Sequence, residues 1–440
     1  MRKPDIRTGP RHPRIAAAGY EITRRLSERA LASRGLHKVN GEFAQATIAS
    51  IRERLQRGET IYIAGLACPG THNTGVALVE VTQKDGPRLI VNNEEERFSG
   101  NKHTNEFPQH ALDDMRKVLR RMGRDIGDVA AFVTTWDYPA LLPMLIRTSL
   151  EEAPASIKLL RAPIAPAINL RQMDQVRRIS RRLGKMYGLG EQLPLICMPH
   201  HDNHAWYSFT ASPFADLRER VAIAVLDGTG DVGSISLYVA ENGEMKRLYC
   251  NESLFDSLGA FYTVISSSQG GWTWLSSEGR YMGAAAWGDM NRATNPYYQR
   301  LKAVLQLGPE GRVQLNRAMA NWFADPADNP YKQPLIDILG PPLRPDQLWN
   351  PDAVLRVEDI NHRPDTKDRV DKAAATQLVF EDAMIHVIDH LLRITGTDRL
   401  VLTGGVALNA LGNMRLLEHF DEAWFEQAQQ RKTRLHMWVP

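Results

Sequence analysis

The sequence predicts a two-lobed α/β fold. Two blocks of the chain, opening at residues 61 and 220, each begin with runs typical of antiparallel strands and continue into alternating helix and strand. Gly-rich turns follow several of these strands, and 440 residues are enough for two to four domains. This duplicated layout is typical of a two-lobed protein with a central nucleotide cleft.

The first block, residues 61–219, begins with three strands. IYIAGLA at 61–67 alternates in hydropathy and stops at a Pro-Gly turn, and the next two strands meet at a Lys-Asp-Gly-Pro turn. The remaining expected elements are a helix over about 108–122, a strand over 130–136, an irregular excursion over 155–168, a basic helix over about 171–187, a buried strand over 193–199 and a helix that begins near His200.

The second block, residues 220–440, begins with an apolar strand that ends in an acidic, Gly-rich turn. A hairpin around Asn242-Gly243 follows, because Asn-Gly is a strong signal for a two-residue hairpin turn. The rest is predicted to contain helical insertions over about 290–370, a long helix over about 370–395, a strand, turn and helix over 399–417, and a last strand over 434–440.

The composition, 43% hydrophobic and 24% charged, is that of an ordinary soluble globular protein and excludes disordered, collagen-like and disulfide-stapled classes. Cys68, Cys197 and Cys250 lie far apart with no CxxC, which suits a reducing cytoplasm and excludes a zinc knuckle. No apolar stretch reaches 18 residues, and the net charge of +3 is too weak to indicate nucleic acid. We therefore expect a cytoplasmic protein that binds neither membrane nor nucleic acid.

Residues 1–60 lie outside the duplicated pattern. They hold 13 Lys and Arg against 6 Asp and Glu, whereas the whole chain has 54 against 51. A Pro-punctuated tail precedes two helical stretches at about 15–34 and 42–57, and no apolar core of a secretory signal is present. The segment is predicted to be a basic, solvated helical extension rather than a nucleic-acid arm.

Three histidines directly follow the strand expected at 193–199. His200 and His204 are four residues apart, so both imidazoles project from one face of a helix and can bind one metal ion. Imidazole suits iron, zinc or nickel. His201 points elsewhere and is predicted to contact substrate or to support a ligand. The alternative is a helix N-terminus with surface histidines.

Two glycine-rich turns are candidates for nucleotide or metal binding. Asp227 ends a buried strand and precedes Gly228 and Gly230, so the backbone can approach a phosphate or the carboxylate can hold a metal. Gly404 and Gly405 join a strand to a helix whose N-terminus favours anionic or polar ligands. A plain turn at the first position and simple packing at the second are the alternatives.

A densely charged loop spans residues 92–108, where three carboxylates are followed by Arg97, Lys102 and His103. A solvated loop is the default interpretation. A lysine held in a cleft would instead contact a phosphate or a carbonyl group.

Taken together and in order, these strings resemble the nodulation-protein-U type O-carbamoyltransferases, a family that includes antibiotic-tailoring enzymes. The resemblance covers about 61–440. It rests on seven matches: G-L-x(5)-H at 65–72, E-E-R-F-S-x-x-K-H at 95–103, H-H-x-x-H-A at 200–205, V-L-D-G-x-G at 225–230, S-L-G-x-F-Y at 257–262, E-G-R-Y-M-G-x-A-A-x-G at 278–288 and G-G-V-A-L-N at 404–409.

The resemblance implies the duplicated, RNase-H-like superfold of the actin/Hsp70/sugar-kinase ATPases. It also implies one iron bound by His200, His204 and Asp227, and transfer of a carbamoyl group from carbamoyl-adenylate, made from carbamoyl phosphate and ATP, to a substrate hydroxyl. Lys102 would contact the adenylate and His72 would face the acceptor. The residues expected at the nucleotide are Asp227, Gly228, Gly230, Gly279, Arg280, Gly283, Gly404, Gly405 and Asn409.

The expected chemistry agrees with these residue types. Carbamoyl transfer passes through an oxyanion, which a bound cation stabilises while a lysine neutralises the leaving phosphate. The acceptor alcohol also needs a proton acceptor, for which His72, His201 or a metal-bound group are the candidates.

The sequence departs from the family in three places. His72 is followed by Asn73 instead of an aspartate, and Arg280 stands where the family has lysine. After Pro440 the family continues into a stretch with a further iron-binding aspartate and then a YrdC-like domain that makes carbamoyl-adenylate. This chain is therefore expected to be a fragment, a truncated gene product or a protein that works with a partner that supplies such a domain in trans, and to be a weak or incomplete enzyme alone.

The leading prediction is thus an O-carbamoyltransferase module whose acceptor is a small-molecule alcohol, either a sugar or a natural product. One alternative is a non-catalytic remnant that binds metal or nucleotide. Another is a small-molecule kinase of the same superfold, which is less favoured because phosphoryl transfer does not need a histidine pair.

Overall fold

The computed structural model describes residues 5–67, 73–161, 170–188, 192–215, 218–322, 324–325, 329–343, 349–353 and 355–440. The chain divides into two compact units, each described by itself. The N-terminal unit contains residues 14–150 and 158–203, and the C-terminal unit contains residues 1–13, 151–157 and 204–440. The chain therefore crosses between the units four times, and the last crossing falls inside helix α8 (His200–Thr210) rather than at residue 219.

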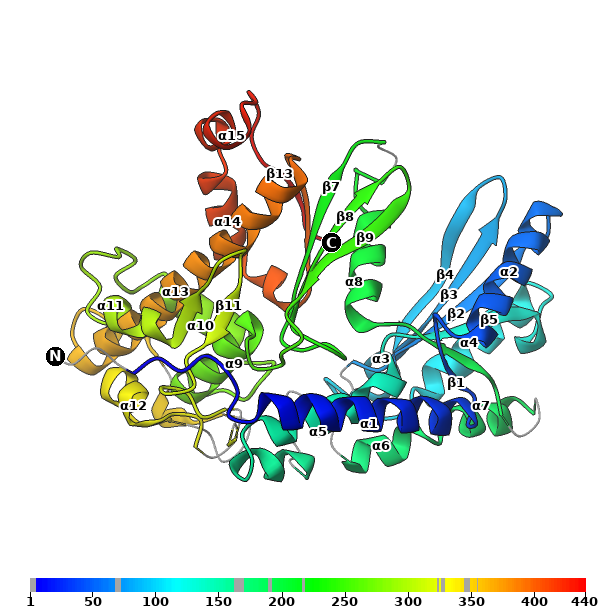
Figure 1. The fold of residues 1–440 in the computed structure, drawn as a ribbon, viewed down its shortest axis with the longest axis horizontal. Helices are drawn as coiled ribbons and strands as arrows, with labels where there is room; N and C mark the ends of the chain where they lie inside the picture. The colour runs from blue at the N-terminus through cyan, green and yellow to red at the C-terminus, as the bar shows by residue number, and fades with distance from the viewer. Residues whose placement is uncertain are drawn as a thin grey trace. The chain divides into compact units, whose positions relative to one another are not determined.

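The N-terminal unit is built on a six-stranded sheet with the order β1-β6-β5-β2-β3-β4 (Figure 1). Strand β2 pairs antiparallel with β3, which pairs antiparallel with β4, whereas β2, β5, β6 and β1 run parallel. The bounds are β1 Leu36–Lys38, β2 Ile61–Ala67, β3 Gly75–Thr82, β4 Gly86–Glu94, β5 Val129–Thr134 and β6 Leu195–Cys197.

Strand β1 shows that residues 14–60 are part of this unit and not a separate extension. Leu36 is fully buried and pairs with Leu195, and Lys38 pairs with Cys197. Burial of a leucine side chain stabilises a fold by about 1.5–3 kcal/mol. Burial of Leu36 therefore favours the pairing of this short strand with β6 at the sheet edge. The prediction of a helical extension that covers part of the core missed this strand, because a count of basic residues cannot reveal such pairing.

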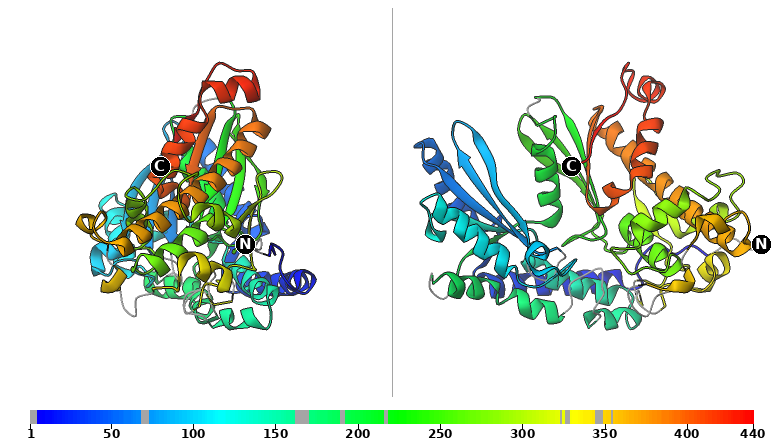
Figure 2. Two further views of the ribbon diagram at one scale, coloured as in Figure 1. Left: turned by 90° about the vertical axis from the view of Figure 1, so that its left-hand side faces the viewer. Right: turned by 180° about the vertical axis from the view of Figure 1, so that it is seen from behind.

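Helices cover both faces of this sheet. The larger core packs Leu112 and Met115 of α4 and Leu183 of α7 against strand residues such as Leu78. On the other face, Ala44 of α2 packs in a smaller cluster. Figure 2, right, shows the light-blue β3–β4 hairpin from behind. The helices of this unit are α1 Pro13–Ala32, α2 Glu42–Gln56, α3 Glu96–Ser99, α4 Gln109–Arg121, α5 Tyr138–Glu151, α6 Leu170–Val176 and α7 Ile179–Tyr187.

The C-terminal unit contains a five-stranded sheet with the order β13-β12-β7-β8-β9. Its first strand, β7, pairs antiparallel with β8 and parallel with β12, so the topology repeats that of β2, β3 and β5. The hairpin between β8 and β9 turns at Asn242, whose φ is +53°. The bounds are β7 Val221–Leu226, β8 Ile235–Glu241, β9 Glu244–Cys250, β12 Arg399–Thr403 and β13 His436–Trp438.

This repetition confirms the predicted fold class. In each sheet the strand that opens the repeated block, β2 or β7, has an antiparallel pair of later strands on one side and two later parallel strands on the other. This is the duplicated, RNase-H-like topology of the actin/Hsp70-like superfold. The N-terminal unit adds only β1 to this plan.

The helices of the C-terminal unit pack around α13 (Pro364–Thr395), which starts with Pro364 in its first turn and ends at Gly396 in the left-handed conformation. The predicted insertion at 290–370 contains a small antiparallel sheet, β10 Leu305–Leu307 with β11 Val313–Leu315, as well as helices. The other helices are α8, α9 Leu258–Gln269, α10 Glu278–Ala285, α11 Tyr298–Leu301, α12 Gln333–Leu339, α14 Ala410–His419 and α15 Glu422–Gln429. Short 3-10 turns occur in both units. They are η1 Ile126–Asp128, η2 Ala155–Leu160, η3 Lys302–Val304, η4 Pro351–Ala353, η5 Val357–Asp359 and η6 Gly405–Leu408.

Arg7 takes part in an ion-pair cluster within the C-terminal unit. Arg317 is 1% exposed and donates to Glu151 and Glu152, each at 3.1 Å, and Arg7 donates to Glu152 at 2.7 Å. Burial raises the pKa of Glu152, but the two guanidinium groups outweigh it and hold this pKa below its ordinary value. Removing one partner of such a buried pair typically costs about 3–5 kcal/mol.

None of the helices that the structure describes combines the length and the apolar character that a bilayer crossing requires.

Candidate metal centre and nucleotide turn

The candidate site is built at the carboxyl ends of β7 and β12. These strands are parallel neighbours, with Thr403 paired to Val225, so the turns that follow them start side by side. Every residue of β7 is buried, and Asp227 is the first carboxylate after it, with 14% of its side chain exposed. Polar groups that follow parallel strands meet at one edge of a sheet, which is where ligands bind in α/β folds.

The two oxygens of Asp227 have different surroundings. Oδ1 accepts hydrogen bonds from the backbone N–H of Gly228 at 2.8 Å and of Gly405 at 2.9 Å. Oδ2 lies 3.5 Å from Nε2 of His204. Backbone donors stabilise the ionised carboxylate, and they fix the carboxylate plane so that Oδ2 is presented to the histidine.

Gly404 permits the close approach of the two turns. Its φ is +90°, and a Cβ placed there would lie 2.4 Å from the carbonyl oxygen of Leu226. A side chain would therefore both strain the backbone and push the β12 turn away from β7. The structure thus supports the packing alternative for Gly404, and ligand approach at this glycine stays a prediction.

A third segment supports the Asp227 turn from the start of α9. Ser257 caps this helix by accepting from the N–H of Ala260, and its hydroxyl lies 3.0 Å from the carbonyl of Asp227 and 2.8 Å from that of Gly228. A Cβ on Gly259 would lie 2.6 Å from Cα of Gly228. The S-L-G string therefore holds the turn against the helix, a role that its residue types alone did not reveal.

His204 is oriented by two hydroxyl side chains. Its Nδ1 lies 3.5 Å from Oγ1 of Thr403, and Ser208, one helical turn further along α8, donates to the same Oγ1 at 2.8 Å. A histidine that binds a metal through Nε2 usually donates its Nδ1–H to such a supporting group. Thr403 gives no functional signal in the sequence, because only its glycine neighbours form a recognisable pattern.

His200 is oriented by residues that follow β5. Its Nδ1 lies 3.1 Å from the carbonyl oxygen of Thr135, and its ring stacks on Trp136 with a centroid separation of 4.0 Å. A carbonyl accepts only from a protonated Nδ1, and in the neutral imidazole with that proton Nε2 is the nitrogen that can bind a metal ion.

The structure brings His200, His204 and Asp227 together, with one ligand atom from each lying within 4.8 Å of the others. Metal–ligand bonds of about 2.1 Å place the ligands of one ion at most about 4.2 Å apart, so the cluster is close to the size of a coordination sphere. Two imidazoles and a carboxylate are a donor set that iron or zinc accepts, and each donor is held by a separate hydrogen bond. These residues fit a divalent metal ion.

The valine variant of Thr403 tests this orientation. We expect Thr403→Val to weaken Co²⁺ binding by about 10-fold, because His204 loses its supporting hydroxyl. The measurement is calorimetric titration of the purified chain with Co²⁺. Thr397→Val is the matched control, since Thr397 is also buried and precedes the opposite end of β12. Equal affinities for the two variants would show that Thr403 does not orient His204.

The other predicted catalytic residues are less closely tied to this cluster. His201 is 4% exposed, and its ring centroid lies 5.9 Å from that of His200 at an interplanar angle of 43°. Lys102 is exposed in the loop after α3. His72 lies outside the described residues. The roles of all three stay predictions.

Among the predicted nucleotide residues, Asn409 has its side chain turned inward, where it caps α14 and pairs with Gln377. On α10, a Cβ on Gly279 or Gly283 would meet nothing within 4 Å. Arg280 lies on this helix with its guanidinium 3.9 Å above the ring of Trp272. Gly230 lies in the Asp227 turn, where its N–H donates to Gly233.

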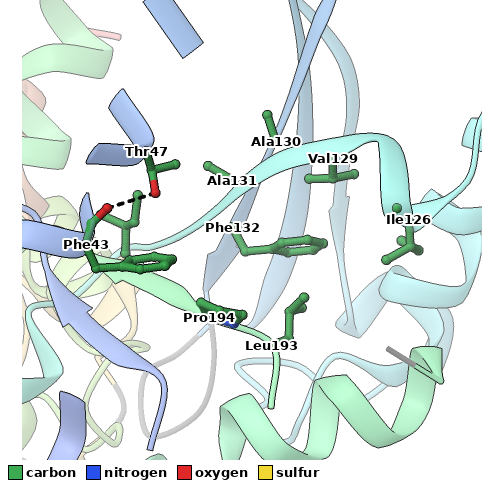
Figure 3. A pocket seen from close by; sticks show the side chains of 11 residues that line it. Phe43, Thr47, Ile126, Val129, Ala130, Ala131, Phe132, Leu193 and Pro194 are labelled. Carbon is green, nitrogen blue, oxygen red and sulfur yellow. Dashed lines mark hydrogen bonds between the residues drawn. The ribbon is translucent and has the colours of Figure 1, made fainter. Parts of the chain in front are cut away.

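A separate small pocket of about 230 Å³ lies at the amino-terminal halves of β5 and β6 (Figure 3). Its lining carries no charged side chain, and the hydroxyl of Thr47 donates to the carbonyl of Phe43. His200 follows the carboxyl end of β6, so this pocket is not part of the histidine cluster. The lining residues are Phe43, Thr47, Ile126, Gly127, Val129, Ala130, Ala131, Phe132, Leu193, Pro194 and Ile196.

Comparisons with known proteins agree with the motif pattern. The chain is 27% identical over 365 residues to an uncharacterized protein, sll1178, of Synechocystis, covering 81% of this chain and 53% of that protein. It is 26% identical over 356 residues to the nodulation protein NolNO of Sinorhizobium fredii, covering 79% of this chain and 44% of that protein. The chain thus spans about half the length of these relatives.

Solved structures with a similar arrangement have low sequence identity. HypF of T. kodakarensis is 14% identical, with a TM-score of 0.33, over 86% of this chain and 45% of HypF. Lmo2764 of Listeria monocytogenes, a putative N-acetylmannosamine kinase, is 13% identical with a TM-score of 0.34 over 86% of this chain and 93% of that protein.

The family assignment rests on the sequence. The family described as "Carbamoyltransferase N-terminus" matches residues 63–430, which is most of the chain. The match includes the histidine string, Asp227 and the Gly404-Gly405 turn. The chain therefore belongs to the carbamoyltransferase N-terminus family.

Proposed function

We propose that this chain is the transferase module of an O-carbamoyltransferase, which moves a carbamoyl group from carbamoyl-adenylate to a hydroxyl of a small-molecule alcohol. One observation carries the proposal: Gly405 of the predicted nucleotide turn donates to Oδ1 of Asp227, whose Oδ2 faces His204. A nucleotide at this turn and a metal ion at the histidines would therefore be neighbours.

In the proposed reaction the acceptor oxygen bonds to the carbamoyl carbon, the bond from that carbon to the adenylate phosphate breaks, and AMP leaves. The acceptor hydroxyl loses its proton, for which His201 or His72 is the proposed acceptor. Lys102 would offset the charge that develops on the leaving phosphate. Gly404 and Gly405 would admit the nucleotide close to the backbone.

His200, His204 and Asp227 would hold the metal ion, for which we propose iron. When bound, the ion supplies a positive charge that polarises the carbamoyl oxygen. The chain's own contribution is to hold the three ligands in place before the ion arrives, through Thr135, Thr403 and the backbone of the two turns. Such preorganisation avoids a reorganisation cost during the reaction.

The proposed partners follow from the same chemistry. The acceptor is a sugar or natural product with a free hydroxyl, and a YrdC-like domain would supply carbamoyl-adenylate in trans. A non-catalytic remnant that only binds metal or nucleotide is the second candidate, favoured by Asn73, which carries no acid where the resembled family has one.

A transfer assay distinguishes these candidates. We expect the purified chain, loaded with Fe²⁺ and given preformed carbamoyl-adenylate with a panel of simple glycosides, to release AMP together with a carbamoylated glycoside. From ATP and carbamoyl phosphate we expect product only when a YrdC-like domain is added. Lys102→Ala should lower the rate by about 10²-fold, whereas Cys197→Ala, in a buried strand position, should leave it nearly unchanged. Metal binding without any transfer would support the remnant.

A further inference from the structure

A pair of buried amide side chains connects the long helix α13 to the nucleotide turn. Nε2 of Gln377 donates to Oδ1 of Asn409 at 3.0 Å, and Nδ2 of Asn409 donates back to Oε1 of Gln377 at 2.9 Å. Gln377 is completely buried and Asn409 is 8% exposed. Two hydrogen bonds in opposite directions fix the relative orientation of both amides.

The remaining hydrogen-bonding capacity of Gln377 is also used. Oε1 accepts a second hydrogen bond, from the hydroxyl of Tyr262 at 3.0 Å, and Nε2 makes its second donation to Oε1 of Glu381 at 3.0 Å. Burial holds the pKa of Tyr262 well above its ordinary value, so the phenol stays a donor. A glutamine with both donors and both acceptor positions occupied has a single satisfied orientation, and a flipped amide would break all four bonds.

Asn409, held by Gln377, in turn restrains the η6 turn that precedes it. Its Oδ1 also accepts from the N–H of Gly412 at 2.8 Å, which caps α14. Between Gly405 and this cap there is only the single 3-10 turn η6, which is braced by a hydrogen bond from Asn413 to the carbonyl of Ala407 at 2.8 Å. The turn thus has little freedom to shift its first N–H, which is the one that Gly405 donates to Asp227.

We infer that Gln377 is a positioning residue for the Asp227 carboxylate. Gln377 fixes Asn409, Asn409 fixes the η6 turn, and the turn places the Gly405 N–H that holds Oδ1 of Asp227. Oδ2 is thereby aimed at the metal ligands, so loosening a residue on α13 weakens the ion site without touching it. As far as it concerns the ion, this inference rests on the proposed function.

The test compares Gln377→Met with Thr395→Val in the full chain. Methionine keeps the length of the side chain but removes the hydrogen-bond acceptor of Asn409 Nδ2 and of the Tyr262 hydroxyl. Thr395 is a buried residue of the same helix, and its hydroxyl bonds only to the helix backbone, so the valine variant controls for a general loss of stability. Gln377→Leu, which also lacks the amide but places no sulfur atom in the core, serves if the methionine variant does not fold.

Two measurements test the two ends of this hydrogen-bonded connection: hydrogen exchange at the η6 turn and Co²⁺ binding at the Asp227 site. In Gln377→Met we expect amide hydrogen exchange in the peptide 404–413 to accelerate about 10-fold or more, and Co²⁺ binding to weaken about 10-fold with a changed visible absorption spectrum. Thr395→Val should change neither. Gln377→Leu should behave like the methionine variant, because it removes the same four hydrogen bonds.

Unchanged exchange in 404–413 would overturn the inference, and so would faster exchange with unchanged Co²⁺ affinity, since Asp227 would then not depend on the turn. His204→Ala separates this from the proposed function. If the wild type binds no Co²⁺ that depends on His204, the proposed metal site fails, and the exchange rates alone decide whether Gln377 holds the turn.

Discussion

Replacing His204 by alanine is expected to weaken binding of Fe²⁺ or Co²⁺ by more than about 100-fold and to abolish carbamoyl transfer. Loss of a supporting group already costs about 10- to 100-fold in metal affinity, and this change removes a ligand itself. Nε2 of His204 lies 3.5 Å from Oδ2 of Asp227, so the change also removes the imidazole that faces this carboxylate oxygen. Metal content per chain and Co²⁺ titration measure the effect.

His362→Ala is the control for this variant, because His362 is exposed in a loop before α13 and lies outside the cluster. The control should keep the metal content of the wild type. A His204→Ala protein whose Co²⁺ affinity stays within about threefold of the wild type would show that the ion binds elsewhere or not at all.

Gly404→Ala is expected to lower the free energy of unfolding by about 3 kcal/mol or more. The added Cβ would sit 2.4 Å from the carbonyl oxygen of Leu226, at a φ of +90° that side chains rarely adopt. Strain of the backbone and overpacking each cost about 1–3 kcal/mol. Urea unfolding followed by fluorescence measures the change.

Gly396→Ala separates the two causes. Gly396 also has a positive φ, of +64°, but a Cβ there would meet nothing within 4 Å. Its replacement should cost only the backbone term, about 1–2 kcal/mol. If both variants lost the same stability, the close approach of the β12 turn to β7 would not be what requires glycine at position 404.

Much of the fold could be predicted because it is written in local patterns. Apolar strand runs such as 61–67 and 221–226 mark the start of each repeated block, and Asn242-Gly243 marks a hairpin. The pairing of His200 with His204 could be predicted because a helix places residues four apart on one face. Asp227 was suggested by its place at the end of a buried strand.

The remaining features depend on contacts that local patterns do not encode. Gly405 and Asp227 are separated by 178 residues, and only the pairing of β7 with β12 brings them together. Thr403 gives no signal in the sequence because a strand threonine is ordinary there. Strand β1 is equally hidden, since three residues, Leu36–Lys38, are too few for a periodic pattern.

The four crossings of the chain between its units have a consequence for biosynthesis. Glu151 and Glu152 emerge from the ribosome well before Arg317, which follows 165 residues after Glu152. At 5–20 residues per second, Arg317 is added to the chain roughly 10–30 s after these two carboxylates. The C-terminal unit therefore assembles around two segments made long before it, and no single continuous segment of the gene encodes it.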